Sequence, residues 1–172
     1  MPRKCKVCKT KFEPRYNSVQ PCCSVSCAYQ YAKDLKEKKW KKEKAKRKKE
    51  LMTLQDWLKI CQTHFNKYIR LRDKGNNCIS CNKPAKKENA GHYRSVGGNP
   101  ELRFNEENVY LQCEYCNTYQ HGNLIEYRKN LVNKIGLERV EWLEGKHEPK
   151  KYTIPEVKEL IEYYKAKIKE FK

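Results

Sequence analysis

Two Cys-x2-Cys pairs, Cys78 with Cys81 and Cys113 with Cys116, constrain the fold of this chain more than any other feature. Each pair forms a knuckle whose backbone turn presents two thiolates to one metal ion, and two knuckles complete a tetrahedral zinc site. The alternative is four unrelated buried cysteines. Four thiolates leave no open coordination position, so we expect a structural zinc that contributes on the order of 10 kcal/mol to folding.

The composition explains why the fold needs such a structural zinc site. Only 38% of the 172 residues are hydrophobic and 35% are charged, so one large core is not expected. The N-terminus, MPRKCKVCKTKFEP, is basic and lacks the apolar run of a secretion signal, and no stretch is apolar enough to cross a membrane. We therefore expect a protein of the reducing cytoplasm, where paired cysteines bind metal rather than form disulfides.

A second group of cysteines lies within residues 1–28, which contain little apolar material. Cys5 and Cys8 form one Cys-x2-Cys pair, and Cys23 with Cys27 is the best second pair. Cys22 would then be a spare thiol, although an exchange of Cys22 for Cys23 is the alternative. The sequence predicts an N-terminal zinc finger with four cysteine ligands here, and its contacts with DNA or with protein look alike at this level.

The charge of the chain points to a polyanionic partner. Its 39 lysines and arginines exceed its 21 acidic residues by 18, which fits DNA, RNA or an acidic membrane surface. The membrane is the weakest option because the basic run has no broad apolar face. Residues 29–52 form this run, without Gly or Pro, and predict a solvated basic helical linker. Four of its side chains are expected to contact DNA: Lys41, Lys42, Lys46 and Arg47.

The rest of the chain, residues 53–172, is predicted to be one small zinc-stapled α+β domain with flanking helices. Thr53 and Thr153 each stand at an N-cap position, so helices should begin after them. Between these helices, the pattern predicts extended segments at 90–94 and 109–112 and a helix from 117 or 118 towards 135. The central ββα part covers about residues 78–135.

The segment from Gly91 to Asn117 carries more polar residues than a zinc ribbon needs. His92 ends the first expected strand, Asn108 directly precedes the second, and Asn117 follows the last cysteine. This layout resembles the HNH, or ββα-metal, nuclease motif over about residues 78–125. In that family, a hairpin and a helix hold one divalent cation against the scissile phosphate.

The resemblance implies a role for each polar residue. His92 would be the general base, because a neutral imidazole is available near pH 7. Asn108 would fix the loop that orients His92, and Asn117 would lie near the cation and the phosphate. His121, four residues later and expected on the same helix face, is the alternative for that third role. The implied catalytic cation is Mg²⁺ or Mn²⁺.

One position departs from the family pattern. The family often has an Asp directly before its first His as a metal ligand, and Gly91 stands there in this chain. The cation would then be held more weakly, or through His121 and water, and three glutamates nearby are alternative ligands: Glu88, Glu106 and Glu107. The competing interpretation is that the histidine only hydrogen-bonds within the hairpin and the module binds DNA without cutting it.

Further segments extend the resemblance along the chain. "CISC", "GHYRS", "ELRFNEENVYLQCEYCN" and "YRKNL", together with the order of finger, basic helix, HNH-like block and final helix, resemble the NinG family of lambdoid phages, also called Rap. That resemblance implies a recombination endonuclease acting in the host cytoplasm on branched DNA such as Holliday junctions and D-loops. It also implies two structural zinc ions, a catalytic cation and, as further partners, host or phage recombination proteins or a second copy of the chain.

Other residues near the predicted site have both a DNA-binding interpretation and a structural one. Three arginines are expected to contact phosphates, unless they are only solvated surface charges: Arg94, Arg103 and Arg128. Three aromatic side chains could stack on exposed bases, although a place in the hairpin core is favoured: Tyr93, Phe104 and Tyr110. The rival functions are a non-catalytic zinc-finger protein that binds nucleic acid and a scaffold that recruits recombination proteins.

Overall fold

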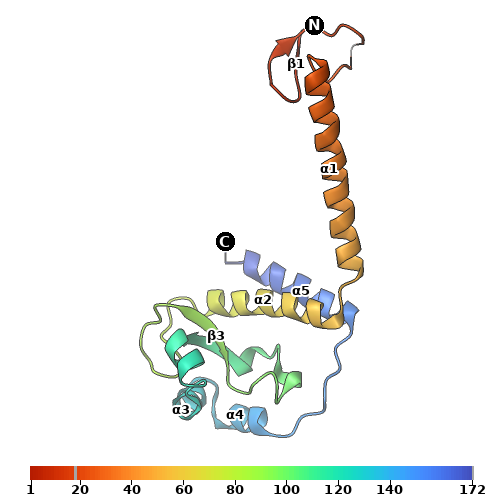
Figure 1. The fold of residues 1–172 in the computed structure, drawn as a ribbon. Coiled ribbons are helices and arrows are strands. Elements are labelled where there is room, and N and C mark those ends of the chain that lie inside the picture. The colour runs from red at the N-terminus through yellow and green to blue at the C-terminus, as the bar shows by residue number, and fades with distance from the viewer. Residues whose placement is uncertain (18, 172) are drawn as a thin grey trace. The chain divides into compact units, whose positions relative to one another are not determined.

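The computed structural model describes residues 1–17 and 19–171, and the chain divides into two compact units, Met1–Met52 and Thr53–Lys172. The architecture is a mixture of helices with two small two-stranded antiparallel sheets (Figure 1). The described part of the chain contains no helix with the length and apolarity that a membrane span requires.

The first unit consists of a small hairpin and one long helix. Strands β1 (Arg3–Lys4) and β2 (Lys11–Phe12) pair antiparallel, and α1 (Val25–Glu50) follows, drawn in orange in Figure 1. Ser24 caps α1 by accepting a hydrogen bond from the backbone N–H of Cys27. The helix therefore begins inside the predicted finger, and the boundary expected between residues 28 and 29 falls within α1. None of the α1 side chains is buried.

Two helices far apart in the sequence frame the second unit. Helix α2 (Leu54–Arg72) packs along α5 (Ile154–Lys169), as Figure 1 shows. Both predicted N-caps are confirmed, because Thr53 and Thr153 each form a reciprocal capping box with the residue three positions later. Phe65 on α2 lies edge-on to Tyr164 on α5, with ring centroids 5.1 Å apart, so the two apolar stripes form one interface.

The hairpin of the second unit consists of β3 (Glu88–His92) and β4 (Val109–Cys113). Their antiparallel register pairs His92 with Val109 at the loop end and Glu88 with Cys113 at the open end. The loop between them contains the 3-10 turns η1 (Pro100–Leu102) and η2 (Glu106–Asn108). The first strand begins and ends two residues earlier than predicted, so His92 is its last residue.

The C-terminal end of α2 is tied to this hairpin. Asp73 Oδ2 accepts a hydrogen bond from the Leu111 backbone N–H at 2.9 Å. Arg72 donates to the Val109 carbonyl at 2.8 Å and to the Glu106 carbonyl at 2.9 Å. The two charged side chains also pair with each other, so neither charge is left uncompensated. They thereby hold β4 and the loop before it in a defined position.

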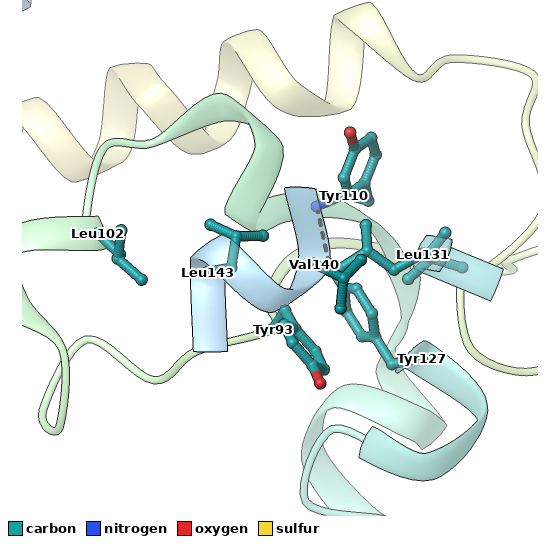
Figure 2. Packing of buried hydrophobic residues seen from close by; sticks show 8 residues of the cluster. Tyr93, Leu102, Tyr110, Tyr127, Leu131, Val140 and Leu143 are labelled. Atoms are coloured by element: carbon teal, nitrogen blue, oxygen red, sulfur yellow. Dashed lines mark hydrogen bonds between the residues drawn. The ribbon is translucent and has the colours of Figure 1, made fainter. Parts of the chain in front are cut away.

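Helices α3 (Leu124–Ile135) and α4 (Leu137–Glu144) cover the hairpin. Gly136, with a φ of +84°, separates them in a conformation that favours glycine. Figure 2 shows the core that forms between these helices and the strands, in which the Tyr93 and Tyr127 rings lie 5.4 Å apart. The members of this core cluster are Ile79, Tyr93, Leu102, Tyr110, Tyr127, Leu131, Val140 and Leu143.

The predicted helix from residue 117 or 118 to 135 is wrong in its first part. A π-helical turn, η3 (Tyr115–Tyr119), follows β4, and α3 begins only at Leu124. Between them, His121, Gly122 and Asn123 have φ values of +48°, +93° and +45°. Three successive left-handed residues cannot continue a right-handed helix, so the chain turns here before α3 starts.

Candidate active site and metal centres

The first thiolate cluster joins the β1–β2 hairpin to the start of α1. The Sγ atoms of Cys5, Cys8, Cys23 and Cys27 lie within 4.8 Å of one another. Tetrahedral zinc with Zn–S bonds of about 2.3 Å places its sulfur atoms about 3.8 Å apart. The separations of 3.5 Å between Cys8 and Cys23, and of 3.9 Å between Cys23 and Cys27, fit such a site. Cys22 lies outside the cluster and is buried.

Local hydrogen bonds shape this cluster. The Cys5 backbone N–H donates to the Thr10 carbonyl, and Lys9 takes a φ of +63°, which closes the knuckle between the two strands. Burial raises the pKa of the Cys5 thiol, but hydrogen bonds from the backbone N–H groups of Cys23, Val7 and Cys8 outweigh it and lower this pKa to about 5. The backbone therefore favours a thiolate at Cys5, which is the form that binds metal, whereas the neighbouring thiol of Cys8 and burial raise the pKa of Cys23 to about 12.

The second thiolate cluster lies at the open end of the β3–β4 hairpin. The Sγ atoms of Cys78, Cys81, Cys113 and Cys116 lie within 4.8 Å of one another, and those of Cys81 and Cys113 are 3.9 Å apart. The Ile79 backbone N–H donates to the Leu111 carbonyl at 2.9 Å, which fixes the first knuckle beside β4. Both clusters could therefore hold structural zinc, and this one would join the segment after α2 to the end of the hairpin.

His92 lies at the opposite, loop end of the hairpin, where the backbone sets its orientation. Its Nε2 is 3.1 Å from the Arg103 carbonyl oxygen. A carbonyl can only accept, so Nε2 carries the proton, and Nδ1 of the neutral ring is an acceptor that has no partner among the described residues. Burial lowers the pKa of His92 below its ordinary 6.5, and the nearby Arg103 charge acts in the same direction. The imidazole is therefore neutral at pH 7, as a general base must be.

Asn108 fixes the loop that follows His92. Its Oδ1 accepts from the Arg94 backbone N–H at 2.7 Å, and its Nδ2 donates to the carbonyls of Arg94 at 3.0 Å and Leu102 at 3.2 Å. The side chain is completely buried, so all three hydrogen bonds are shielded from water. They close the loop across its base and restrain the backbone beside His92.

The third predicted position is more open. Asn117 lies in η3, directly after the second thiolate cluster, and is partly buried. His121 is exposed and lies in the left-handed turn rather than in a helix. The expectation that Asn117 and His121 share one helix face is therefore wrong, because three residues with positive φ interrupt the helix at that point. His92 lies at the loop end of the hairpin, whereas Asn117 comes after Cys113, which lies at the open end.

A steric clash explains why glycine, and no larger residue, stands directly before His92. A Cβ atom on Gly91 would lie 2.1 Å from Gln112 Oε1 and 2.9 Å from Gln112 Cβ. Gln112 is completely buried, and its Nε2 donates to Ser80 Oγ and to the Gly122 carbonyl, each at 2.6 Å. No aspartate fits at this position while Gln112 stays in place. The glycine is thus part of the packing of this hairpin.

Comparison with known proteins decides the family. A family model described as "Bacteriophage Lambda NinG protein" matches residues 1–172. The chain belongs to the NinG family. "Protein ninG" of Escherichia phage 933W is 35% identical over 188 residues, which cover 99% of this chain and 94% of that protein. The Escherichia phage lambda protein is 35% identical and the Salmonella phage P22 protein 34%, and each alignment covers 99% of this chain and 93% or 94% of the relative. No solved structure matches.

The three arginines expected to contact phosphate differ in this NinG-family chain. Arg128 is held by Glu144 through two hydrogen bonds of 2.7 and 3.0 Å, so its charge is compensated. Arg103 donates its Nε–H to Gln62 at 2.9 Å. Arg94 Nε is buried and has no hydrogen-bond partner among the described atoms. Of the three, Arg94 is the one whose guanidinium group makes no hydrogen bond to a described residue.

Sequence reasoning missed Tyr127, which links α3 to the strand that carries His92. Its hydroxyl donates to the Gly91 carbonyl at 2.9 Å and accepts from the Tyr110 backbone N–H at 3.1 Å. The second of these hydrogen bonds is drawn in Figure 2. A completely buried tyrosine needs such partners, and here they support the backbone directly before His92. Its place in "YRKNL" gave no signal, because a tyrosine on an apolar helix face is ordinary core.

Proposed function

We propose that this protein is an endonuclease that hydrolyses phosphodiester bonds in branched DNA during phage recombination inside the host cell. One observation carries the proposal: a neutral, partly buried His92 stands at the end of a hairpin strand, with Nε2 held by a carbonyl and with no hydrogen-bond partner for Nδ1 among the described residues. Such a group can take a proton from an attacking water. The sequence order of strand, strand and helix, together with the thiolate cluster, resembles the HNH motif and supports this proposal.

Within this proposal, each residue has a limited task. His92 accepts the proton of the water at Nδ1 while the Arg103 carbonyl keeps the ring oriented. Asn108 holds the loop, and Arg94 binds a phosphate oxygen near the reacting bond. Asn117 is assigned to the third HNH position, on η3, and His121 is its alternative. The preference for branched DNA rests on the family resemblance.

The described residues offer no preformed site for a catalytic cation beside His92. Gly91 has no side chain, Glu106 accepts a hydrogen bond from Tyr68, and Glu107 pairs with Arg139. Among the described residues, the groups of three or more close metal-ligating side chains are the two cysteine clusters. Mg²⁺ commonly binds through few carboxylates together with substrate phosphates and water. The experiment below therefore measures directly whether cleavage depends on added Mg²⁺ or Mn²⁺.

Binding of the DNA is assigned mainly to α1. At 100° per residue, Lys38, Lys39, Lys42 and Lys46 fall within one third of the helix circumference, and none of the four acidic residues of α1 lies between them. All four lysines are exposed, and Lys46 also lies 3.9 Å from Glu50 at the edge of this lysine face. Two of the predicted contacts lie elsewhere: Lys41 pairs with Glu37, and Arg47 pairs with Glu43, each at 2.5 Å. The lysine face is thus better suited to phosphates than the set chosen from sequence.

A non-catalytic, zinc-stapled DNA-binding protein is the second candidate function. The observation that favours it is the lack of a carboxylate cluster beside His92 in the described part of the chain. The net charge of +18 supports DNA binding equally under both functions.

The deciding experiment compares cleavage of a four-way junction and of linear duplex by the wild type and by His92→Ala, with and without Mg²⁺ or Mn²⁺. Loss of a general base lowers the rate by about 10²- to 10⁴-fold, whereas junction binding should remain nearly unchanged. His64→Ala is the matched control, because His64 lies on α2 and should not affect cleavage.

Two further variants locate the third position. Asn117→Ala should lose much of the activity and His121→Ala less; the reverse order would move the role to His121. Full cleavage by His92→Ala would overturn the role of His92 as the base and with it the HNH assignment. A wild type that binds the junction but never cuts it would overturn the nuclease proposal itself.

A further inference from the structure

Two tyrosines stand exposed on η3, directly beside the second thiolate cluster. Tyr115 is 62% exposed and Tyr119 is 69% exposed, and their ring centroids lie 6.2 Å apart with an angle of 36° between the ring planes. The aromatic side chains first considered for base stacking are buried instead, since Tyr93, Phe104 and Tyr110 are each at most 8% exposed. Among the described aromatic side chains of the second unit, Tyr115 and Tyr119 are therefore the most exposed.

The backbone holds this tyrosine pair on a rigid base. Cys113 and Cys116 bracket the start of η3 and belong to the thiolate cluster. The Gln120 backbone N–H donates to the Tyr115 carbonyl at 3.1 Å, and the Gly122 N–H donates to the Cys116 carbonyl at 2.8 Å. π-Helical turns are rare and frequently occur at functional sites. The turn keeps two rings in solvent at a fixed place, which a purely structural turn would not need.

Two lysines lie on the chain segment that runs beside the start of η3. The Glu114 backbone N–H donates to the Lys87 carbonyl at 3.1 Å, so the segment with exposed Lys86 and Lys87 runs next to the start of η3. Lys87 forms a close ion pair with Glu114, which leaves Lys86 as the uncompensated charge of this segment among the described residues. Aromatic faces with adjacent lysines are the arrangement by which proteins bind single strands without reading their sequence.

We propose that Tyr115 and Tyr119 form a stacking platform for an unpaired nucleobase, with Lys86 on an adjoining phosphate. This inference rests on the proposed function only in that the partner is DNA, and it does not depend on cleavage. Every base has a π face, so the platform accepts any base but requires that it be unpaired. It would thus favour a branch or single-stranded arm over intact duplex.

The test measures binding in the absence of divalent cations, so that no substrate is cut. One DNA has a single-stranded arm with 2-aminopurine at successive unpaired positions, and the other is a blunt duplex with the same number of phosphates. Stacking on a tyrosine should quench the fluorescence of 2-aminopurine at one or two positions. Tyr115→Ala and Tyr119→Ala should each weaken binding of the single-stranded arm on the order of 10-fold and remove the quenching, while duplex binding stays unchanged.

Matched variants separate stacking from other causes. Tyr115→Phe and Tyr119→Phe keep the ring and should bind like the wild type. Tyr163→Ala removes a tyrosine of the same unit that is 47% exposed on α5, and it should change nothing. Zinc content and near-ultraviolet circular dichroism show whether each variant is folded. The wild-type quenching and the Phe variants remain informative if an Ala variant misfolds.

Several results would overturn the platform. The first is that the wild type quenches no unpaired position, and the second is that the alanine variants bind the single-stranded arm normally. The others are that the Phe variants bind as weakly as the Ala variants, or that the Ala variants lose as much affinity for duplex as for the single-stranded arm. A pair that instead captures a protein partner would give the second of these results. Failure of the nuclease proposal looks different, because the wild type would then leave the junction uncut with Mg²⁺ or Mn²⁺ while the tyrosine variants still lose single-strand binding.

Discussion

The two thiolate clusters lie in very different surroundings. In the first unit, Cys5 and Cys22 are the buried residues among 1–17 and 19–52, and α1 buries no side chain at all. In the second unit, Ile79 directly follows a cluster cysteine and belongs to a core with Tyr127 and Leu131. Metal would therefore replace a core in the first unit, whereas in the second it would fasten a hairpin onto an existing one.

This difference between the units suits them to two different tasks, the presentation of charge and the precise positioning of side chains. The first unit presents charge on a helix whose stability comes from its own sequence, and small shifts of its lysines cost little. The second unit holds His92, Asn108 and their backbone partners at hydrogen-bonding distances, which requires dense packing. Binding should thus depend on the number of charges in the first unit, and chemistry on the geometry of the second.

Removal of one zinc ligand from each cluster gives the largest expected effects. Cys113→Ala should lose about one zinc per chain, and with it much of a contribution on the order of 10 kcal/mol, so the hairpin and its core should unfold. Cys8→Ala should also lose about one zinc but leave the unfolding transition of the second unit unchanged. Zinc titration and thermal unfolding measure both. A stable Cys113→Ala protein with unchanged zinc content would contradict the expected difference between the two clusters.

The next effect concerns the charge of α1. Replacement of Lys38, Lys39, Lys42 and Lys46 by Gln should weaken binding to every DNA alike and reduce the slope of log affinity against log salt by up to about 3 to 4. The control removes the same number of charges from other faces, at Lys36, Lys41, Arg47 and Lys48, and should reduce the slope less. Equal slopes for both variants would mean that the face of α1 is irrelevant.

Dense packing in the second unit is tested at Gly91. The Gly91→Ala change pushes a methyl group into Gln112, which is buried and held by two hydrogen bonds, and should lower the free energy of unfolding by about 1 to 3 kcal/mol. Gly97→Ala has open space around the new methyl group and should change this energy by less than about 0.5 kcal/mol. Urea denaturation compares the two. Similar losses, or none, would show that the site adapts.

The smallest effect is a shift along the pH axis. His92 must be neutral to act as a base, and burial holds its pKa below 6.5, so kcat/KM for cleavage should fall only below that pH. The same lowered pKa means that the unfolded chain binds more protons between the two pKa values. Stability is therefore complete above pH 6.5 and declines as pH falls through that window. A fall in kcat/KM that begins above the ordinary histidine pKa would contradict this assignment.

Local patterns determined much of this protein from sequence alone. The caps Thr53 and Thr153 act within a single helical turn, and the charge of α1 depends only on its composition. The cysteine pairs, at a fixed short spacing, likewise indicated both clusters. The tertiary structure decided what depends on partners distant in sequence: the exclusion of Cys22, the pairing of Arg128 with Glu144, and the packing of Gln112 against Gly91. It also decided the left-handed turn before α3, because the thiolate cluster and the Tyr127 contacts hold the chain on either side of that turn and outweigh its helical propensity.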